Sequence, residues 1–114
     1  MLACRFFRTD EGLLTGFELS GHVNGGSKGE NLICAGATTL AQTCVSSVAF
    51  LLGRDAVVEK GDSGFLRFLL KGEPDTQTDL LLRSMVVGLQ YLEKAGGKPG
   101  IRIEYASGGK IDGS

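Results

Sequence analysis

The sequence is poor in the residues that mark several specialised protein classes. Its 114 residues include no tryptophan, two prolines and a single histidine, and its acidic and basic residues nearly balance at a formal net charge of −1. A general nucleic-acid binder usually has a basic excess, so we expect no direct nucleic-acid partner. No uninterrupted apolar run of about 18 residues occurs, and we therefore expect no membrane span.

Cysteine is scarce too, and its spacing excludes two common uses. Cys4, Cys34 and Cys44 are odd in number and form no CxxC or zinc-ligand pattern. Cys4 and Cys44 fall on apolar faces and are expected in the core. We expect free thiols in a reducing compartment, with no disulfide, no metal and no cofactor. The N-terminal stretch 1–12 lacks the apolar segment of a secretory signal, so a cytoplasmic location is expected by default.

Short alternating apolar segments predict the strands. In one of them, Phe17 and Leu19 fall on the same face by the period of two. The polar sequence GDSG between two later segments indicates a hairpin. The expected strands cover residues 2–8, 13–19, 56–60, 64–71 and 101–105.

Two longer segments repeat apolar residues at helical spacing. The first helix is expected to begin near Leu32 and to run to Leu52, with Asn31 as its N-cap. A second helix of about five turns is expected from Thr76, which would form a capping box with Asp79.

The resulting order, ββαββαβ, favours an α+β fold in a single domain that spans residues 1–114. We expect a two-layer sandwich, in which two helices pack on one face of a mostly antiparallel sheet. The second helix also carries Leu80, Leu82 and Val86 off its main apolar stripe. Because one core needs less apolar surface than this, the pattern indicates a subunit interface.

Reactive side chains cluster in the segment from His22 to Cys34. The lone histidine is the obvious base for catalysis near neutral pH. Cys34 is expected near the third position of the first helix, where free amide N–H groups and the positive end of the helix dipole lie. Such a position favours the thiolate and can bind the oxyanion of a tetrahedral intermediate. The pattern indicates a cysteine–histidine enzyme that catalyses acyl transfer.

Simpler interpretations stay open at this point. A cysteine near a helix start is more often a small buried hydrophobe than a nucleophile, and a lone loop histidine is usually solvated. Gly25, Gly26 and Gly29 also suggest a phosphate-binding loop, but Lys28 is not followed by the Ser or Thr that this motif requires. We expect instead that these glycines allow a flap to open and close over an extended peptide.

The residues around this pair resemble those of a known family. Gly21-His22, a glycine-containing loop and the sequence LICAGA at 32–37 resemble the Prp family of ribosomal-processing cysteine proteases. Eleven residues separate the histidine from the cysteine, and the similarity extends over essentially the whole chain. The resemblance implies that Cys34 and His22 are the catalytic residues.

The resemblance also implies a substrate and partners. Members of the family are peptidases of the bacterial cytoplasm that remove a short N-terminal extension from large-subunit ribosomal protein twenty-seven, after an aromatic residue. They are homodimers that associate through their helices. We therefore expect the precursor of that ribosomal protein as a partner, together with a second copy of this chain. The flexible substrate-binding loop would comprise Gly21, Gly25, Gly26 and Gly29.

Two positions beside the cysteine qualify the resemblance. Family members commonly have aspartate three residues before the cysteine, where this chain has Asn31. Asparagine can orient an imidazole but lends it no charge, so Asn31 is either an orienter or only a helix cap. Thr38 stands one turn beyond Cys34, where the family often has serine, and its hydroxyl is expected to line the cleft.

The sequence thus predicts a cysteine endopeptidase in which Cys34 attacks the peptide carbonyl and His22 acts as general base and then as general acid. The alternative is a non-catalytic, ribosome-associated binding module that uses the same cleft. A third interpretation is a cysteine hydrolase of the same geometry that acts on another short peptide.

Overall fold

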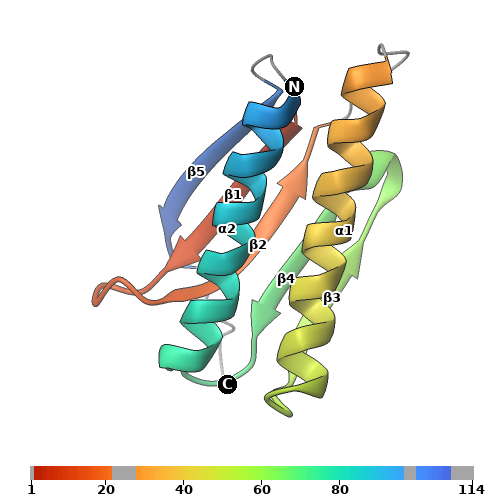
Figure 1. Ribbon diagram of the computed structural model, residues 1–114. Helices are drawn as coiled ribbons and strands as arrows, with labels where there is room; N and C mark the ends of the chain where they lie inside the picture. Colours follow the sequence, from red (N-terminus) through yellow and green to blue (C-terminus); the bar gives the residue numbers. More distant parts are fainter. Residues whose placement is uncertain (1, 22–27, 97–99, 109–114) are drawn as a thin grey trace.

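Two helices lie side by side on one face of a five-stranded sheet (Figure 1). The computed structural model describes residues 2–21, 28–96 and 100–108. The helices are α1 (Lys28–Phe50) and α2 (Thr76–Gly96), and a short 3-10 turn, η1 (Asp62–Gly64), joins two strands. The strands are β1 (Leu2–Arg8), β2 (Leu14–Ser20), β3 (Ala56–Lys60), β4 (Leu66–Leu70) and β5 (Ile101–Ser107).

The strand order is β3-β4-β2-β1-β5, which confirms the predicted α+β class and the order ββαββαβ. The pairs β3–β4, β4–β2 and β2–β1 are antiparallel, whereas β5 runs parallel to β1. A parallel neighbour needs a crossover connection, and α2 supplies it between β4 and β5 while it packs on β2 and β5. The sheet is therefore mixed, with mostly antiparallel pairing as predicted.

The helix-facing side of the sheet carries a row of aromatic rings in register. Phe68, Phe17, Phe6 and Tyr105 lie opposite one another on β4, β2, β1 and β5. Successive ring centroids are 5.6, 6.1 and 6.1 Å apart, within the range of favourable aromatic pairs. The three phenylalanines are fully buried and form the centre of the core.

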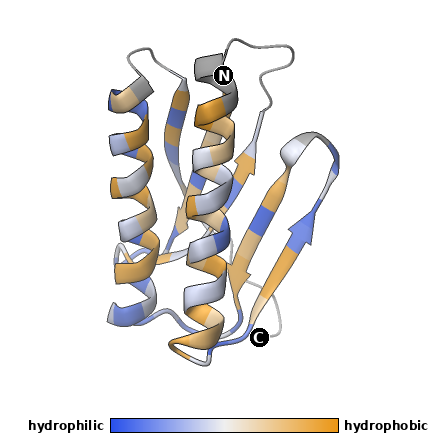
Figure 2. Ribbon diagram, turned by 45° about the vertical axis from the view of Figure 1, so that its right-hand side comes forward, coloured by the Kyte–Doolittle hydropathy of each residue, from blue (hydrophilic) through white to orange (hydrophobic). Residues whose placement is uncertain are grey.

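The opposite side of the sheet carries a row of alternating charge. Glu59, Arg67, Glu18, Arg5 and Glu104 lie opposite one another across all five strands of the described sheet. Arg67 binds Glu18 at 2.8 Å and Glu59 at 3.8 Å, and Arg5 lies 3.5 Å from Glu104. Each such surface pair contributes about 0–1 kcal/mol, so the row specifies the solvent face and the register more than it stabilises the fold. Figure 2 shows the alternation of apolar and polar residues as bands of opposite colour along the strands.

α1 begins four residues earlier than predicted, at Lys28. Its first turn contains Gly29 and Asn31, so the predicted N-cap role of Asn31 is wrong, and Gly29 belongs to the helix and not to the preceding loop. Lys28 and Glu30 are good helix formers, and one glycine costs only about 1 kcal/mol, so the helix propagates backward through these residues.

The N-terminus of α2 is capped one residue before the predicted position. The Asp75 carboxylate accepts the backbone N–H groups of Gln77 and Thr78, both at 2.9 Å, and the Thr78 hydroxyl accepts the Asp75 N–H in return. The predicted box of Thr76 and Asp79 is therefore wrong. The Asp79 carboxylate instead accepts the Leu14 N–H at 2.8 Å and ties α2 to β2.

α1 and α2 approach each other through two reciprocal leucine–glycine contacts. The side chain of Leu92 on α2 covers Gly36 on α1, and that of Leu40 on α1 covers Gly88 on α2. Glycine at these positions leaves room for the leucine side chains, so the helices pack closely along this half of their length. Leu82 and Val86, which we expected at an interface, are buried in the core, whereas Leu80 is 67% exposed.

The stretch Leu32–Phe50 of α1 is long and apolar enough to cross a membrane by length and composition alone, at a hydropathy of 1.4. This finding differs from our expectation of no membrane span. Many small residues raise the mean hydropathy of the stretch, although it contains no long run of large apolar side chains. One side of the stretch is buried in the core, through Ile33, Ala37, Ala41, Cys44 and Val48. Serine and threonine hydroxyls occupy much of the other side, a pattern typical of a helix that packs on one face.

Gly16 is required by the close approach of β2 and β4. A Cβ at this position would collide with the backbone carbonyl oxygen of Phe68, which cannot move without breaking the sheet. We expect Gly16→Ala to lower the free energy of unfolding by about 3 kcal/mol in urea denaturation. Gly12→Ala is the control, because its Cβ meets nothing within 4 Å and only its φ of +90° is unfavourable, at about 1 kcal/mol. Equal losses for the two variants would contradict the collision.

Asp75 makes the stability of α2 depend on pH. Its hydrogen bonds to the backbone of Thr78 and Gln77, and the Arg54 charge 3.2 Å away, hold the pKa of the carboxyl below its ordinary value of 3.8. The stabilisation that the charged Asp75 carboxylate gives to the folded state is therefore complete above a pH of 3.8, and it is lost as the pH falls through the lowered pKa. We expect Asp75→Ala to melt below the wild-type protein at pH 7, with a difference that narrows in acid. Asp75→Asn keeps the cap and should lose less; a pH-independent difference for Asp75→Ala would contradict the assignment.

Candidate active site

Cys34 lies on α1 at an open cavity of about 390 Å³. The cysteine is half-buried and its thiol is free. The cavity lies at the end of the sheet where β1 begins and β2 ends, between α1 and the turn that includes η1. Its lining carries no charged side chain among the described residues, which suits an uncharged group of a substrate. The described lining residues are Leu2, Leu19, Gly21, Cys34, Ala35, Thr38 and Gly64.

The bottom of this cavity is apolar. Leu2 and Leu19 are each 3% exposed and belong to the core, and both also line the cavity. Leu2 is the first residue of β1, and Leu19 is the last residue of the neighbouring strand β2 that faces the helices. An apolar side chain placed against them would be removed from water, which contributes about 25 cal/mol for each Å² buried.

Thr38 lines the same cavity one helical turn after Cys34. Its hydroxyl donates a hydrogen bond to the Cys34 carbonyl oxygen at 2.8 Å. The hydroxyl proton is thus engaged by the helix backbone, and the oxygen is left as an acceptor toward the cavity. Thr38 can therefore receive a hydrogen bond from a bound peptide without altering the helix.

Cys34 is the seventh residue of α1, since the helix begins at Lys28. The four free amide N–H groups of a helix belong to its first turn, here residues 28–31. Our expectation that Cys34 stands among the free amides is therefore wrong, because the helix extends further back. Helical side chains lean toward the N-terminus, so the thiol lies nearer to the first turn than its own Cα does.

His22, Gly25 and Gly26 lie outside the described residues, and so does the side chain of Asn31. Gly21, the residue before His22, lines the cavity and has a φ of +86°, a conformation that favours glycine. Gly21 therefore ends this described part of the chain at the cavity, and His22 is the next residue in the sequence.

The other two thiols are buried in different surroundings. Burial raises the pKa of Cys44 to about 12 and raises that of Cys4 still further, with the nearby Cys44 as a second cause. Cys44 also lies 3.8 Å from the Leu81 carbonyl oxygen. Neither Cys4 nor Cys44 is among the described residues that line the cavity beside Cys34. The expected core positions of Cys4 and Cys44 are confirmed.

Four of the lining residues were not anticipated from the sequence. Leu19 and Ala35 adjoin the residues already suspected, and the period of two already placed Leu19 on the same face as Phe17. Leu2 and Gly64 carry no such signal, because only the pairing of β1 with β2 and the position of η1 near β2 bring them to Cys34. Among the described residues, no group of three or more His, Cys, Asp or Glu is arranged to hold a metal ion.

A free thiol on a helix, at a cavity with an apolar bottom, is a feature found in cysteine hydrolases. Comparison with known proteins agrees. The family model "Cysteine protease Prp" matches residues 1–99, so the chain belongs to the Prp family of cysteine proteases.

Curated relatives identify the family's activity as ribosomal processing. The Ribosomal processing cysteine protease Prp of Bacillus subtilis (strain 168) is 33% identical over 90 residues, which cover 75% of this chain and 80% of the relative. The protein of the same name from Staphylococcus aureus (strain Mu50) is 30% identical over 99 residues, which cover 84% and 91%.

Solved structures share the fold. The S. aureus protease Prp with a covalently linked product peptide matches with a TM-score of 0.79 at 25% identity, and the same protease with a substrate peptide matches with a TM-score of 0.81 at 24%. Both matches cover 93% of this chain and 100% of the other. SMU.848 from Streptococcus mutans matches with a TM-score of 0.79 at 21% identity, over 95% and 99%.

The three thiols should differ in reactivity. A thiolate is the species that iodoacetamide alkylates, and the raised pKa values and burial of Cys4 and Cys44 suppress it. We expect Cys34 to be alkylated first in the native protein at pH 7, with the other two modified only after denaturation. Mass spectrometry of tryptic peptides taken over time would measure this, with protein in guanidinium chloride as the control. Three thiols that react equally slowly in the native protein would contradict the assignment.

Proposed function

We propose that this chain is an endopeptidase that removes the N-terminal extension of large-subunit ribosomal protein twenty-seven, with Cys34 as nucleophile and His22 as general base and acid. One observation carries the proposal: the free Cys34 thiol lies at a 390 Å³ cavity whose bottom is formed by the buried side chains of Leu2 and Leu19. Family membership and the ribosomal-processing relatives support the same reaction.

In the proposed reaction, His22 takes the thiol proton and Cys34 attacks the carbonyl carbon of the scissile peptide bond. The tetrahedral intermediate expels the amine of the downstream segment, which receives the proton from His22. Water then hydrolyses the thioester and frees the thiol. The free amides of residues 28–31, one turn before Cys34, are the proposed donors to the oxyanion.

The cavity favours cleavage after an apolar residue. An aromatic side chain fits the volume and the apolar bottom, and no described lining residue offers a charge to pair with an ionic one. Thr38 would accept a hydrogen bond from the bound peptide backbone. Because the N-cap position is excluded for Asn31, orientation of the His22 imidazole is its proposed role, and Gly21, Gly25 and Gly26 would allow the segment around His22 to move over the peptide.

We also propose a cytoplasmic location and a homodimer. All three cysteines are free, which suits a reducing compartment. Exposed apolar side chains on the helix layer, among them Leu80, Val87 and Tyr91, suit a second copy of the chain.

Removal of either catalytic residue should abolish cleavage without unfolding the protein. We expect Cys34→Ala and His22→Ala to lower kcat/KM by at least about a thousandfold on a peptide that spans the extension of the ribosomal protein. Cys44→Ala is the matched control, since it removes a thiol from the same helix away from the cavity, and it should cleave at close to the wild-type rate. A Cys34→Ala protein that still cleaves at that rate would falsify the proposal.

A further inference from the structure

One peptide group at the start of β5 is held from both sides. The carbonyl oxygen of Gly100 and the N–H of Ile101 belong to this planar group and point in opposite directions. The carbonyl oxygen accepts the Leu2 N–H at 3.0 Å, and the Ile101 N–H donates to the Glu93 carboxylate at 3.1 Å. The peptide group therefore ties the start of β1 to α2, and both of its polar atoms are satisfied.

Gly100 also contacts the residue that precedes the nucleophile. A Cβ at Gly100 would lie 2.7 Å from Cδ1 of Ile33, so any larger residue at this position would push against that side chain. Ile33 is 5% exposed and directly precedes Cys34 on α1. The start of β1, the side chain from α2 and the turn of α1 that carries Cys34 thus meet at one glycine. We call this meeting point the Gly100 junction, formed by Leu2, Ile33, Glu93, Gly100 and Ile101.

The Gly100 junction joins two walls of the cavity beside Cys34. Leu2 forms part of the apolar bottom of the cavity and is held at the junction through its backbone N–H. Cys34 reaches the cavity from α1, and its neighbour Ile33 packs against Gly100. Neither Gly100 nor Glu93 is among the described residues that line the cavity, so both act on a substrate only through the residues that they hold.

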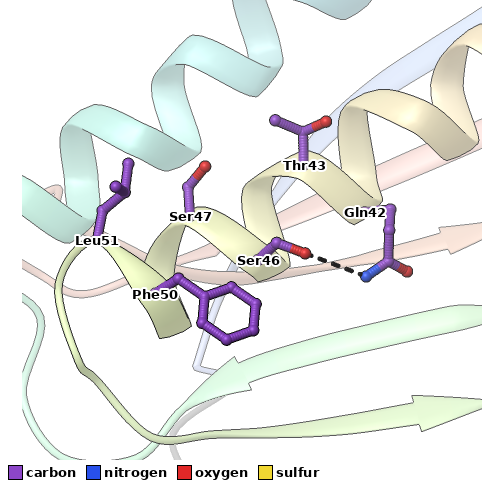
Figure 3. Close-up of a pocket in the computed structure, with 6 residues that line it drawn as sticks. All are labelled: Gln42, Thr43, Ser46, Ser47, Phe50 and Leu51. Atoms are coloured by element: carbon purple, nitrogen blue, oxygen red, sulfur yellow. Dashed lines mark hydrogen bonds between the residues drawn. The ribbon is translucent and has the colours of Figure 1, made fainter.

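The far end of α1 is open to solvent. Phe50 and Leu51 are 85% and 75% exposed, and both line an open pocket of about 370 Å³ (Figure 3). In the same pocket, Gln42 and Ser46 bond to each other across one turn of the helix at 3.5 Å. The last turn of α1 therefore gives the helix little support, and contacts in its other half, the Gly100 junction among them, fix the position of Cys34.

A displacement of Ile33 would also move Cys34, because consecutive residues of an α-helix are only about 1.5 Å apart along its axis. Ordinary contacts between carbon atoms are about 3.5–4.0 Å, so a methyl group at Gly100 would have to move Cδ1 of Ile33 by about 1 Å. Protein cores are close-packed and leave the Ile33 side chain little space to turn into, so α1 takes up part of the shift. Attack on a carbonyl carbon is sensitive to displacements of about 1 Å.

We propose that Gly100 and Glu93 are positioning residues for the reaction. Glu93 fixes the peptide group between Gly100 and Ile101, and Gly100 sets how far the Cys34 segment stands from the bottom of the cavity. Glycine is required at position 100 for its missing side chain, since Ile33 occupies that space. The inference rests on the proposed peptidase function and adds two residues that act through Leu2 and Ile33.

The first test combines Gly100→Ala with Ile33→Val. Valine lacks Cδ1, and the remaining atoms Cγ1 and Cγ2 of Ile33 lie 3.9 and 3.8 Å from the added Cβ, an ordinary contact distance. On a peptide that spans the extension of the ribosomal protein, we expect Gly100→Ala to lower kcat at least about tenfold with a smaller change in KM. The double variant should recover most of that loss. Gly108→Ala, just after the other end of β5, is the control, because its Cβ meets nothing within 4 Å, and it should cleave at close to the wild-type rate.

Glu93 is tested by a second pair of variants. Glu93→Ala should lower kcat about threefold or more, whereas Glu93→Gln keeps an acceptor oxygen for the Ile101 N–H and should retain most of the wild-type rate. The rate at which iodoacetamide alkylates Cys34 supplies a readout that needs no substrate. It should fall at least about twofold in Gly100→Ala and in Glu93→Ala and return in the double variant, with circular dichroism as the check of the fold.

Wild-type kcat and alkylation rates in Gly100→Ala, or a loss that Ile33→Val does not restore, would overturn the inference and leave the proposed function standing. Equal losses in Glu93→Ala and Glu93→Gln would overturn it as well. Should Gly100→Ala fail to fold, the double variant and the Glu93 pair carry the same decision. A wild-type protein that cleaves nothing would overturn the proposed function, and the alkylation rates of the variants would then decide the inference.

Discussion

The register of the sheet is the constraint on which the rest of this structure depends. On the helix side, Phe68, Phe17 and Phe6 meet in one row, and on the solvent side the next row alternates Glu59, Arg67, Glu18, Arg5 and Glu104. Because successive side chains of a strand face opposite sides, a slip of one residue would exchange the two rows and bury the charges. Burying unpaired charge costs far more than any exposed pair contributes, so the two rows together admit a single register.

This register also builds the cavity beside Cys34. With Phe6 opposite Phe17, Leu19 reaches the helix side at the end of β2, and Leu2 reaches it at the start of β1. Those two side chains close the core and at the same time form the bottom of the cavity beside Cys34. The apolar character of the site is thus continuous with the core. Cys4 and Cys44 are buried in that core, and burial raises the pKa values of their thiols, whereas Cys34 lies half-buried at the cavity.

The elements that local sequence determines were predictable, and those that depend on contacts across the fold were not. Alternation placed every strand within one or two residues, since it reflects which side of a strand is buried. The start of α1 was missed because Gly29 and its polar neighbours resemble a loop, whereas the helix accepts one glycine at small cost. The cap of α2 was misplaced by one residue because Asp75 and Thr76 are both good caps, and only the bonds to Thr78 distinguish them.

In the candidate site too, some residues were predictable from the sequence and others were brought in only by the fold. Cys34 was suspected from its sequence neighbourhood, and Gly21 and Thr38 from the resemblance to the family; the structure places all three at one cavity. Gly64 joins them from a turn thirty residues further along, and no local pattern reports that proximity. The parallel pairing of β5 with β1 was equally invisible, since it joins residues as distant as Leu2 and Ile101.

That pairing has a consequence for the order in which the molecule folds. β1 and β5 are joined only across the elements that lie between them in the chain, and contacts of such long sequence separation form slowly. Leu2, which lines the cavity beside Cys34, donates its backbone N–H to the Gly100 carbonyl oxygen at 3.0 Å, directly before β5. The cavity therefore depends on one of the contacts that form late, whereas the helix that carries Cys34 is built from local hydrogen bonds.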